Sequence, residues 1–219
     1  MLEDGDRGVI IQRDQETYAI APHLPCGLVT PEILRKLADA AEKYEAKAIK
    51  ITSAARIALI GLKEDDIDAI WQELQMDPGG VVGLCVRSVK ACPGMTFCKR
   101  AVQDSLEVGL VLDKKYHGVE MPGKMKIGVS GCPNQCAETS FKDIGLVGAR
   151  KGWRVLVGGC GGARPRIADT LAMDLSTEDA LALVDKVVDY FREHAKPKER
   201  IGKTIDRLGL AHMEQSLGL

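Results

Sequence analysis

The chain is organised around Ala91-Cys92-Pro93-Gly94-Met95-Thr96-Phe97-Cys98 and Ser130-Gly131-Cys132-Pro133-Asn134-Gln135-Cys136. These stretches are C-x5-C and C-x3-C pairs, and a proline directly follows the first cysteine of each. Proline lacks a backbone N–H and fixes its own φ, so neither pair can begin as an ordinary helix. We therefore predict that each first cysteine lies in a turn and each second one at or near a helix start.

Four thiolates from two loops suit a cubane iron–sulfur cluster, because each iron takes one protein ligand. Disulfides fit poorly, since the chain has seven cysteines and no secretory signal. A structural zinc site more typically shows shorter spacings than x5. Four unrelated buried thiols are the remaining alternative, but two Cys-Pro turns with matching flanks argue against it. The pattern favours a 4Fe–4S cluster bound by Cys92, Cys98, Cys132 and Cys136.

Composition excludes several classes of function. The formal net charge of the 219 residues is −1 and aromatic residues make up 4%. The chain therefore has no global attraction to nucleic acid or anionic membranes, and no platform for stacking bases. Its N-terminus is acidic, and no stretch approaches the roughly 20 apolar residues that span a bilayer. We expect a soluble, cytoplasmic protein.

Residues 1–78 are predicted to form a first domain. Thr30 and Pro31 mark a helix start, as N-cap hydroxyl and first-turn proline. The expected elements are strands at 9–11 and 17–20, a helix at 31–44, strands at 48–52 and 56–62, a helix at 65–74 and a closing strand at 81–86. Strand–helix–strand–strand–helix with a closing strand is a ferredoxin-like βαββαβ pattern. The turn at 77–80 marks the domain boundary.

Residues 79–219 are predicted to form a second, α/β domain. Ser176 and Asp179 resemble a capping box and predict a helix to about Ala195. The other expected elements are a helix from Cys98 towards 112, a strand at 126–129, a short helix at 134–140, a β-pair at 144–149 and 153–157, a glycine turn at 158–162 and two short C-terminal helices.

The motifs C-P-G-M-T-F-C and G-C-P-N-Q-C resemble the cluster motif of the siroheme-dependent nitrite and sulfite reductases. Arg87-Ser88-Val89, the segment 121–126 and the run 155–159 are similar to further motifs of that family, in the same order. The chain is most similar to its small single-unit assimilatory-type sulfite reductases, found in sulfate-reducing bacteria. The resemblance implies an α+β fold, with a ferredoxin-like half-domain before an α/β siroheme and 4Fe–4S domain.

The resemblance also implies an activity. A sulfite reductase would carry out the six-electron reduction of sulfite to sulfide at siroheme, which Cys136 would bridge to the 4Fe–4S cluster. Nitrite reduction of the same type is the alternative substrate. A 4Fe–4S electron-transfer protein without siroheme is the rival from another class, although a simple electron carrier needs no convergent cations. A zinc-stabilised binding module is a third.

Four cations are candidates for binding the substrate anion. Lys124 and Lys126 are two residues apart on a predicted strand, so they should point to the same face. Without the cysteine motif, they would be read as an exposed strand kept soluble by lysine. Arg87 matches the family's haem- and anion-contacting arginine, so the resemblance implies that it also binds the siroheme. Another family arginine has its position occupied by Ala54 here. Arg56 is two residues further on, hence on the same predicted strand face, and is predicted to substitute for it.

Siroheme carries eight carboxylates, so the resemblance implies an arginine-rich pocket. The candidates are Arg100, Arg164 and Arg166, because arginine binds carboxylates bidentately. Gly158 and Gly159 are expected to let the backbone approach the macrocycle. The other three cysteines, Cys26, Cys85 and Cys160, are not expected to be ligands.

The predicted partners are sulfite or nitrite and an electron-donor protein whose identity the sequence does not specify. Larger members of the family contain the two-domain unit twice, with the anion-binding cations and the cluster in different copies. This chain has one copy, so a homodimer with shared sites and a monomer with its own site are both compatible. The sequence shows no large unpaired apolar surface, which favours the monomer.

Overall fold

The computed structural model describes residues 1–219 and divides into two compact units, Met1–Gly83 and Leu84–Leu219. The boundary expected from the sequence lies a few residues earlier. No helix in either unit is long and apolar enough to cross a membrane.

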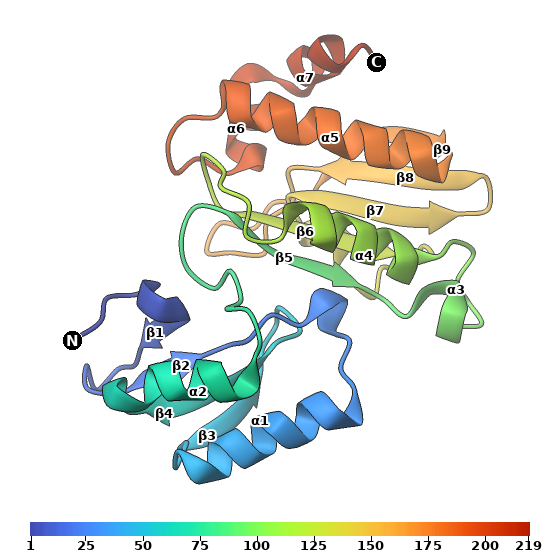
Figure 1. The fold of residues 1–219 in the computed structure, drawn as a ribbon. Helices are drawn as coiled ribbons and strands as arrows, with labels where there is room; N and C mark the ends of the chain where they lie inside the picture. Colours follow the sequence, from blue (N-terminus) through green and yellow to red (C-terminus); the bar gives the residue numbers. More distant parts are fainter. The chain divides into compact units, whose positions relative to one another are not determined.

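The first unit is a four-stranded antiparallel sheet with two helices (Figure 1). Its elements are β1 (Val9–Ile11), β2 (Tyr18–Ile20), α1 (Pro31–Lys43), β3 (Ala48–Ile51), β4 (Ile57–Leu62) and α2 (Ile67–Leu74). The strand order is β1-β2-β4-β3. Both helices pack their apolar residues against the sheet, and Leu37, Ile70 and Leu59 are each at most 2% exposed in that core.

Local sequence signals explain where α1 starts. Thr30 is the N-cap, and its hydroxyl accepts a hydrogen bond from the Ile33 N–H at 3.2 Å. Pro31 occupies the first turn, where its missing N–H costs nothing. Such a cap stabilises a helix by about 1 kcal/mol. The predicted start of this helix is confirmed.

The predicted closing strand at 81–86 is wrong. Val86 instead begins β5 (Val86–Ala91), which belongs to the sheet of the second unit. In the first unit, the segment after α2 makes only a single β-bridge, between Pro22 and Pro78. Proline cannot donate to a ladder, so a strand does not extend from this point.

The second unit is a five-stranded mixed sheet of order β5-β6-β7-β8-β9, in which β5, β6 and β7 are parallel. After β5 its elements are α3 (Gly94–Phe97), α4 (Ser105–Tyr116), β6 (Met125–Ser130), β7 (Ile144–Ala149), β8 (Gly152–Val157), β9 (Asp169–Leu175), α5 (Thr177–His194), α6 (Ile201–Leu208) and α7 (Leu210–Leu217). Helices α4 and α5 lie side by side along the sheet, α4 against β5 and β6 and α5 against β8 and β9 (Figure 1).

Two predictions for this unit need correction, and one strand was missed. Cys98 ends α3 instead of opening a helix, and α4 starts only at Ser105, where the Asp104 carboxylate caps two N–H groups at 3.2 Å. Residues 134–140 do not form the predicted helix, because Gln135 and Glu138 adopt positive φ values that interrupt it. Strand β9 was not predicted at all.

Candidate cofactor and anion site

The first cysteine of each pair lies at the same edge of the sheet. Strands β5 and β6 are parallel neighbours, with Ala91 opposite Val129. Cys92 directly follows β5, and Cys132 comes two residues after β6. Because the carboxyl ends of parallel strands meet at one edge, both cysteine loops start there.

The backbone joins the two loops around Cys92. The Gly131 N–H donates to the Cys92 Sγ at 3.2 Å, and the Ser105 hydroxyl lies 3.0 Å from the same sulfur. The Gly131 carbonyl accepts from the N–H groups of Val102 and Gln103, at 2.8 and 3.1 Å. The Ser105 hydroxyl also donates to the Cys92 carbonyl at 3.1 Å. The two loops are therefore held together around a candidate ligand.

The second cysteine of each pair is more accessible. Cys98 is half-buried and Cys136 is exposed, whereas Cys92 and Cys132 are buried. No group of three or more Cys, His, Asp or Glu side chains is arranged around a single metal ion. A cubane does not need that arrangement, because its four irons each bind a separate thiolate. Two buried and two accessible sulfurs on joined loops fit such a cluster.

Two lysines and an arginine converge at the start of β6. Lys124 immediately precedes β6 and Lys126 lies within it, so alternation directs both side chains to one face. The β5–β6 register shifts at Arg87, and a bulge of this kind redirects a side chain. Burial lowers the pKa of Lys124, and the charges of Arg87 and Arg200 lower it further. Burial and the neighbouring charge of Lys124 likewise lower the pKa of Lys126.

Sequence reasoning missed the other charged residues of this cluster, Lys142, Asp143 and Arg200. Asp143 is 1% exposed, and Arg200 donates to both its carboxylate oxygens, at 2.7 and 2.6 Å. Lys142 is also buried and pairs with Glu138 at 2.9 Å. No local pattern could have revealed the Asp143–Arg200 pair, because 57 residues separate its partners.

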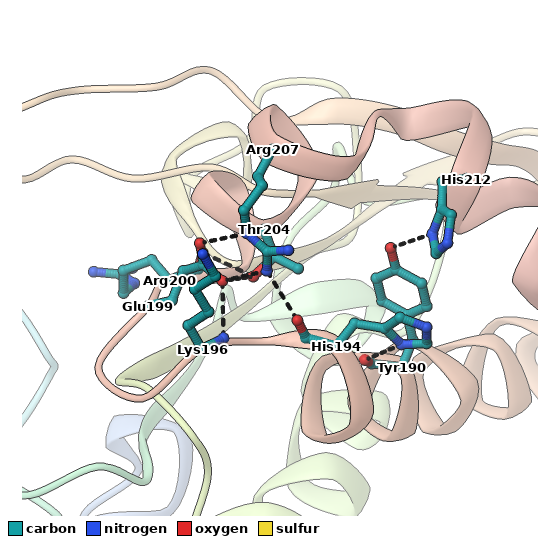
Figure 2. A network of polar contacts seen from close by, with 8 residues as sticks. All are labelled: Tyr190, His194, Lys196, Glu199, Arg200, Thr204, Arg207 and His212. Carbon is teal, nitrogen blue, oxygen red and sulfur yellow. Dashed lines mark hydrogen bonds and ion pairs between the residues drawn. The ribbon is translucent and has the colours of Figure 1, made fainter.

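The loop between α5 and α6 carries Arg200 and is held by the carboxylate of Glu199 (Figure 2). Glu199 accepts hydrogen bonds from Arg207 at 2.7 and 3.1 Å, from the Lys196 N–H at 2.9 Å and from the Thr204 hydroxyl at 3.1 Å. The bonds from Arg207 are the main reason that the pKa of Glu199 is lowered to about 2.

We expect the substitution Glu199→Gln to lower the melting temperature above about pH 5 and to lose that effect towards pH 2. The folded-state pKa of about 2 lies below the ordinary value of 4.5. The stabilisation by Glu199 is therefore complete above the unfolded-state pKa and disappears as the pH falls through the folded-state value. Melting curves of the unmodified protein and of Glu199→Gln across this pH range test the prediction. The exposed Glu193→Gln is the control. A difference in melting temperature that does not change with pH would contradict the lowered pKa of Glu199.

Gly123 lets this loop lie directly against the chain before β6. A Cβ at Gly123 would lie 1.7 Å from the Glu199 carbonyl oxygen, and the Lys198 N–H donates to the Pro122 carbonyl at 2.7 Å. We expect Gly123→Ala to displace the loop and to lower the free energy of unfolding by about 1–3 kcal/mol. Gly161→Ala is the matched control, since the nearest atom there is 3.8 Å away. Equal stability of the two variants in denaturant titrations would refute this.

The glycine turn after β8 packs against the protein itself. Gly158 has a φ of +82°, and a Cβ there would lie 2.8 Å from Nη1 of Arg166. A Cβ at Gly159 would lie 2.5 Å from the carbonyl oxygens of Ser140 and Lys142. Protein atoms therefore fill the space where a side chain at either position would lie, and the expected approach of this backbone to the macrocycle stays a prediction.

Arg166 is also committed within the protein. Its guanidinium donates to Asp206 at 3.0 Å, to Asp169 at 2.6 Å and to the Gly158 carbonyl at 3.2 Å. This corrects the prediction that Arg166 binds a cofactor carboxylate, because all its nitrogens have protein partners. Arg100 and Arg164 are exposed, and their roles stay predictions.

Arg56 lies in the first unit. Residues 52–55 form the turn between β3 and β4, and Ala55 has a φ of 57°. Arg56 follows that turn and is 5% exposed, so it does not share a strand face with Ala54 as predicted. A Cβ on Gly79 would lie 2.8 Å from the Nε of Arg56, which places this side chain against Gly79.

Two family models together match most of the chain. The model described as "Nitrite and sulphite reductase 4Fe-4S domain" matches residues 82–218, and "Nitrite/Sulfite reductase ferredoxin-like half domain" matches residues 10–77. The predicted α+β fold, a ferredoxin-like half-domain followed by a cluster domain, is confirmed.

Curated relatives carry names from the same group. The assimilatory-type sulfite reductase of Nitratidesulfovibrio vulgaris is 43% identical over 216 residues, which cover 99% of each chain. The nitrite reductase [NAD(P)H] of Bacillus subtilis is 40% identical over 207 residues, 94% of this chain and 26% of that protein.

Two solved structures share the fold. Dissimilatory sulfite reductase I matches with a TM-score of 0.83 and 16% identity, over 92% of this chain and 69% of that one. The Mycobacterium tuberculosis NirA protein matches with a TM-score of 0.84 and 17% identity, over 99% of this chain and 46% of that one. At these identities the likeness shows the fold alone.

Proposed function

Because the chain belongs to the nitrite and sulphite reductase family, we propose that it reduces sulfite to sulfide. The observation that carries this proposal is the full-length match to an assimilatory-type sulfite reductase, together with a convergent cation cluster in the cysteine-bearing unit. Nitrite is the alternative substrate, since the chain also matches one part of several nitrite reductases.

The cofactors of this family are a 4Fe–4S cluster and siroheme. We propose that Cys92, Cys98, Cys132 and Cys136 would hold the cluster, and that Cys136 would also help to hold the siroheme. When bound, these groups would relay electrons from an external donor and provide the iron centre for reduction of the anion. Of the predicted partners for the siroheme carboxylates, Arg87, Arg100 and Arg164 are retained.

The protein's own contribution is to bind the anion and deliver protons. Arg87, Lys124 and Lys126 provide positive charge that neutralises sulfite and polarises its oxygens. Burial lowers the pKa of both lysines, and neighbouring positive charges lower it further, which brings each pKa closer to neutral pH. An ammonium group of lowered pKa is a better proton donor, and the six-electron reduction consumes protons. We keep Arg56 as a fourth candidate cation.

Partners beyond the anion are part of the proposal. An electron-donor protein is required, because nothing in the chain generates electrons. We propose a monomer, as the sequence favours. Strand β3 lies at the sheet edge of the first unit and exposes Ile49 and Ile51, which are 52% and 73% accessible. This apolar edge would be available for contact between the two copies of a homodimer. The mass of the cofactor-loaded protein in solution distinguishes a monomer from a homodimer.

The experiment that tests the function is anaerobic purification followed by spectroscopy and turnover. We expect iron, acid-labile sulfide and extractable siroheme, with reduction of sulfite to sulfide by a chemical electron donor. Nitrite turnover is measured in parallel, and a higher kcat/KM for nitrite would favour the alternative substrate. Cluster absorption without tetrapyrrole bands would favour the electron carrier, and a colourless protein would refute both.

A further inference from the structure

Neither Lys124 nor Lys126 forms an ion pair with a protein carboxylate, although a carboxylate lies within their electrostatic range. That carboxylate is Asp143, whose charge acts on both lysines and raises the pKa of each. A buried carboxylate favours pairing with a neighbouring ammonium group, because a buried charge without a partner is costly. The structure therefore needs a reason why both ammonium groups remain available.

The reason is that Arg200 already occupies the carboxylate. Its Nε donates to Oδ1 of Asp143 at 2.7 Å, and its Nη2 donates to Oδ2 at 2.6 Å. Oδ2 also accepts the backbone N–H of Lys126 at 2.7 Å. Burial raises the pKa of Asp143, and the two bonds from Arg200 oppose that effect. A bidentate fork of this kind is stronger than a single contact from an ammonium group.

Both members of the pair are fixed by their surroundings. Asp143 precedes β7, and its backbone carbonyl accepts the Gly158 N–H at 2.8 Å. Arg200 is the N-cap residue of α6, and its guanidinium points away from the Glu199 network that holds the loop (Figure 2). The approach of this loop to Gly123 therefore brings Arg200 to the segment that carries the lysines.

We propose that Arg200 is a positioning residue that sequesters Asp143, so that Lys124 and Lys126 stay free to bind the substrate anion. This inference deepens the proposed function and rests on it. In the absence of Arg200, Asp143 becomes the ion-pair partner of a lysine and competes with the external anion. The titratable groups around the lysines are Arg87 on β5, Lys142 and Asp143 before β7, Cys160 after β8 and Arg200 before α6.

Because Arg200 and Asp143 carry opposite charges, replacing each of them should shift the pKa of the two lysines in opposite directions. In Arg200→Gln, a positive charge disappears and Asp143 is released, so the pKa of both lysines should rise. In Asp143→Asn, the negative charge disappears and Arg200 remains, so the pKa of both lysines should fall. NMR titration of ¹³C-methylated lysines measures these shifts in the purified protein without relying on turnover. A purely structural role would expose the lysines and raise their pKa in both variants.

Anion affinity provides the second readout. We expect Arg200→Gln to weaken sulfite binding, followed by absorbance titration of the cofactor-loaded protein, by about tenfold to a hundredfold. The double variant Arg200→Gln with Asp143→Asn should recover most of that loss, because no carboxylate is left to capture a lysine. Arg192→Gln, an exposed arginine on α5, is the control and should change neither readout.

The outcomes separate this inference from the proposed function. A double variant that binds sulfite as weakly as Arg200→Gln alone would overturn the sequestration of Asp143. Lysine pKa shifts of the same sign in the two single variants would also overturn it. If the protein holds no siroheme, the function fails, while the NMR titration still decides whether Arg200 controls the lysines.

Discussion

Replacing Cys98 by alanine should remove most of the roughly four irons per chain that a 4Fe–4S cluster contributes. The substitution deletes one of four thiolates, and the iron that it would bind is left without a protein ligand. Cys98 is half-buried at the end of α3, where its backbone N–H bonds to the Gly94 carbonyl at 2.8 Å. Because that bond does not involve the side chain, the loop should keep its conformation. Iron and acid-labile sulfide per chain are the measured quantities.

Cys160→Ala is the matched control, because Cys160 is also half-buried and lies in a loop at the end of a strand of the same sheet. It is not a predicted ligand, so iron and sulfide should stay at the level of the unmodified protein. Circular dichroism of both variants checks that the fold is retained. Full iron content in Cys98→Ala, or equal losses in both variants, would remove Cys98 from the ligand set.

Local signals in the sequence were sufficient where one short segment determines the structure. The Thr30-Pro31 start of α1 is such a case, because the cap and the proline act within one turn. The proximity of Lys124 and Lys126 follows from an equally local signal, their spacing of two residues, and the charge of Lys124 does act on Lys126. In both cases the physical cause acts over a few residues, so one sequence contains it.

Features that depend on distant segments could not be predicted in this way. Arg200 reaches Asp143 across 57 residues, and neither side chain belongs to a recognisable motif. Gly158 looks like a flexible turn residue in the sequence. In the structure it has no room for a side chain, because Arg166 and helix α6 pack against it. Which partner fills the space at a glycine is a tertiary property, and composition does not encode it.

The misplaced strand at 81–86 has a different cause. Its apolar residues have high strand propensity, but propensity does not say which sheet a strand joins. Val86 pairs with Met125 in the second unit, so β5 starts where the expected strand was to end. The ferredoxin-like unit therefore lacks its predicted last strand, although the order of its other elements was predicted correctly.

Replacing Lys126 by methionine should reduce kcat/KM for sulfite by about a hundredfold to a thousandfold, the range typical for removing one preorganised donor from an active site. Methionine keeps most of the length of the side chain and removes only the ammonium group. The loss should appear in kcat as well as in KM, because the proposed role includes proton delivery as well as anion binding. Lys151→Met removes the same charge from the exposed turn between β7 and β8, and should leave both constants unchanged.

The stability of the same variant distinguishes loss of function from loss of fold. Burial and the charge of Lys124 lower the pKa of Lys126, so its charged form is less favourable in the folded protein than in the unfolded chain. That cost is present at pH values below the folded-state pKa and disappears as the pH rises above it. Lys126→Met should therefore be at least as stable as the original protein at neutral pH, while it loses activity. A variant that is inactive and also melts at a lower temperature would indicate that Lys126 supports the fold instead of the reaction.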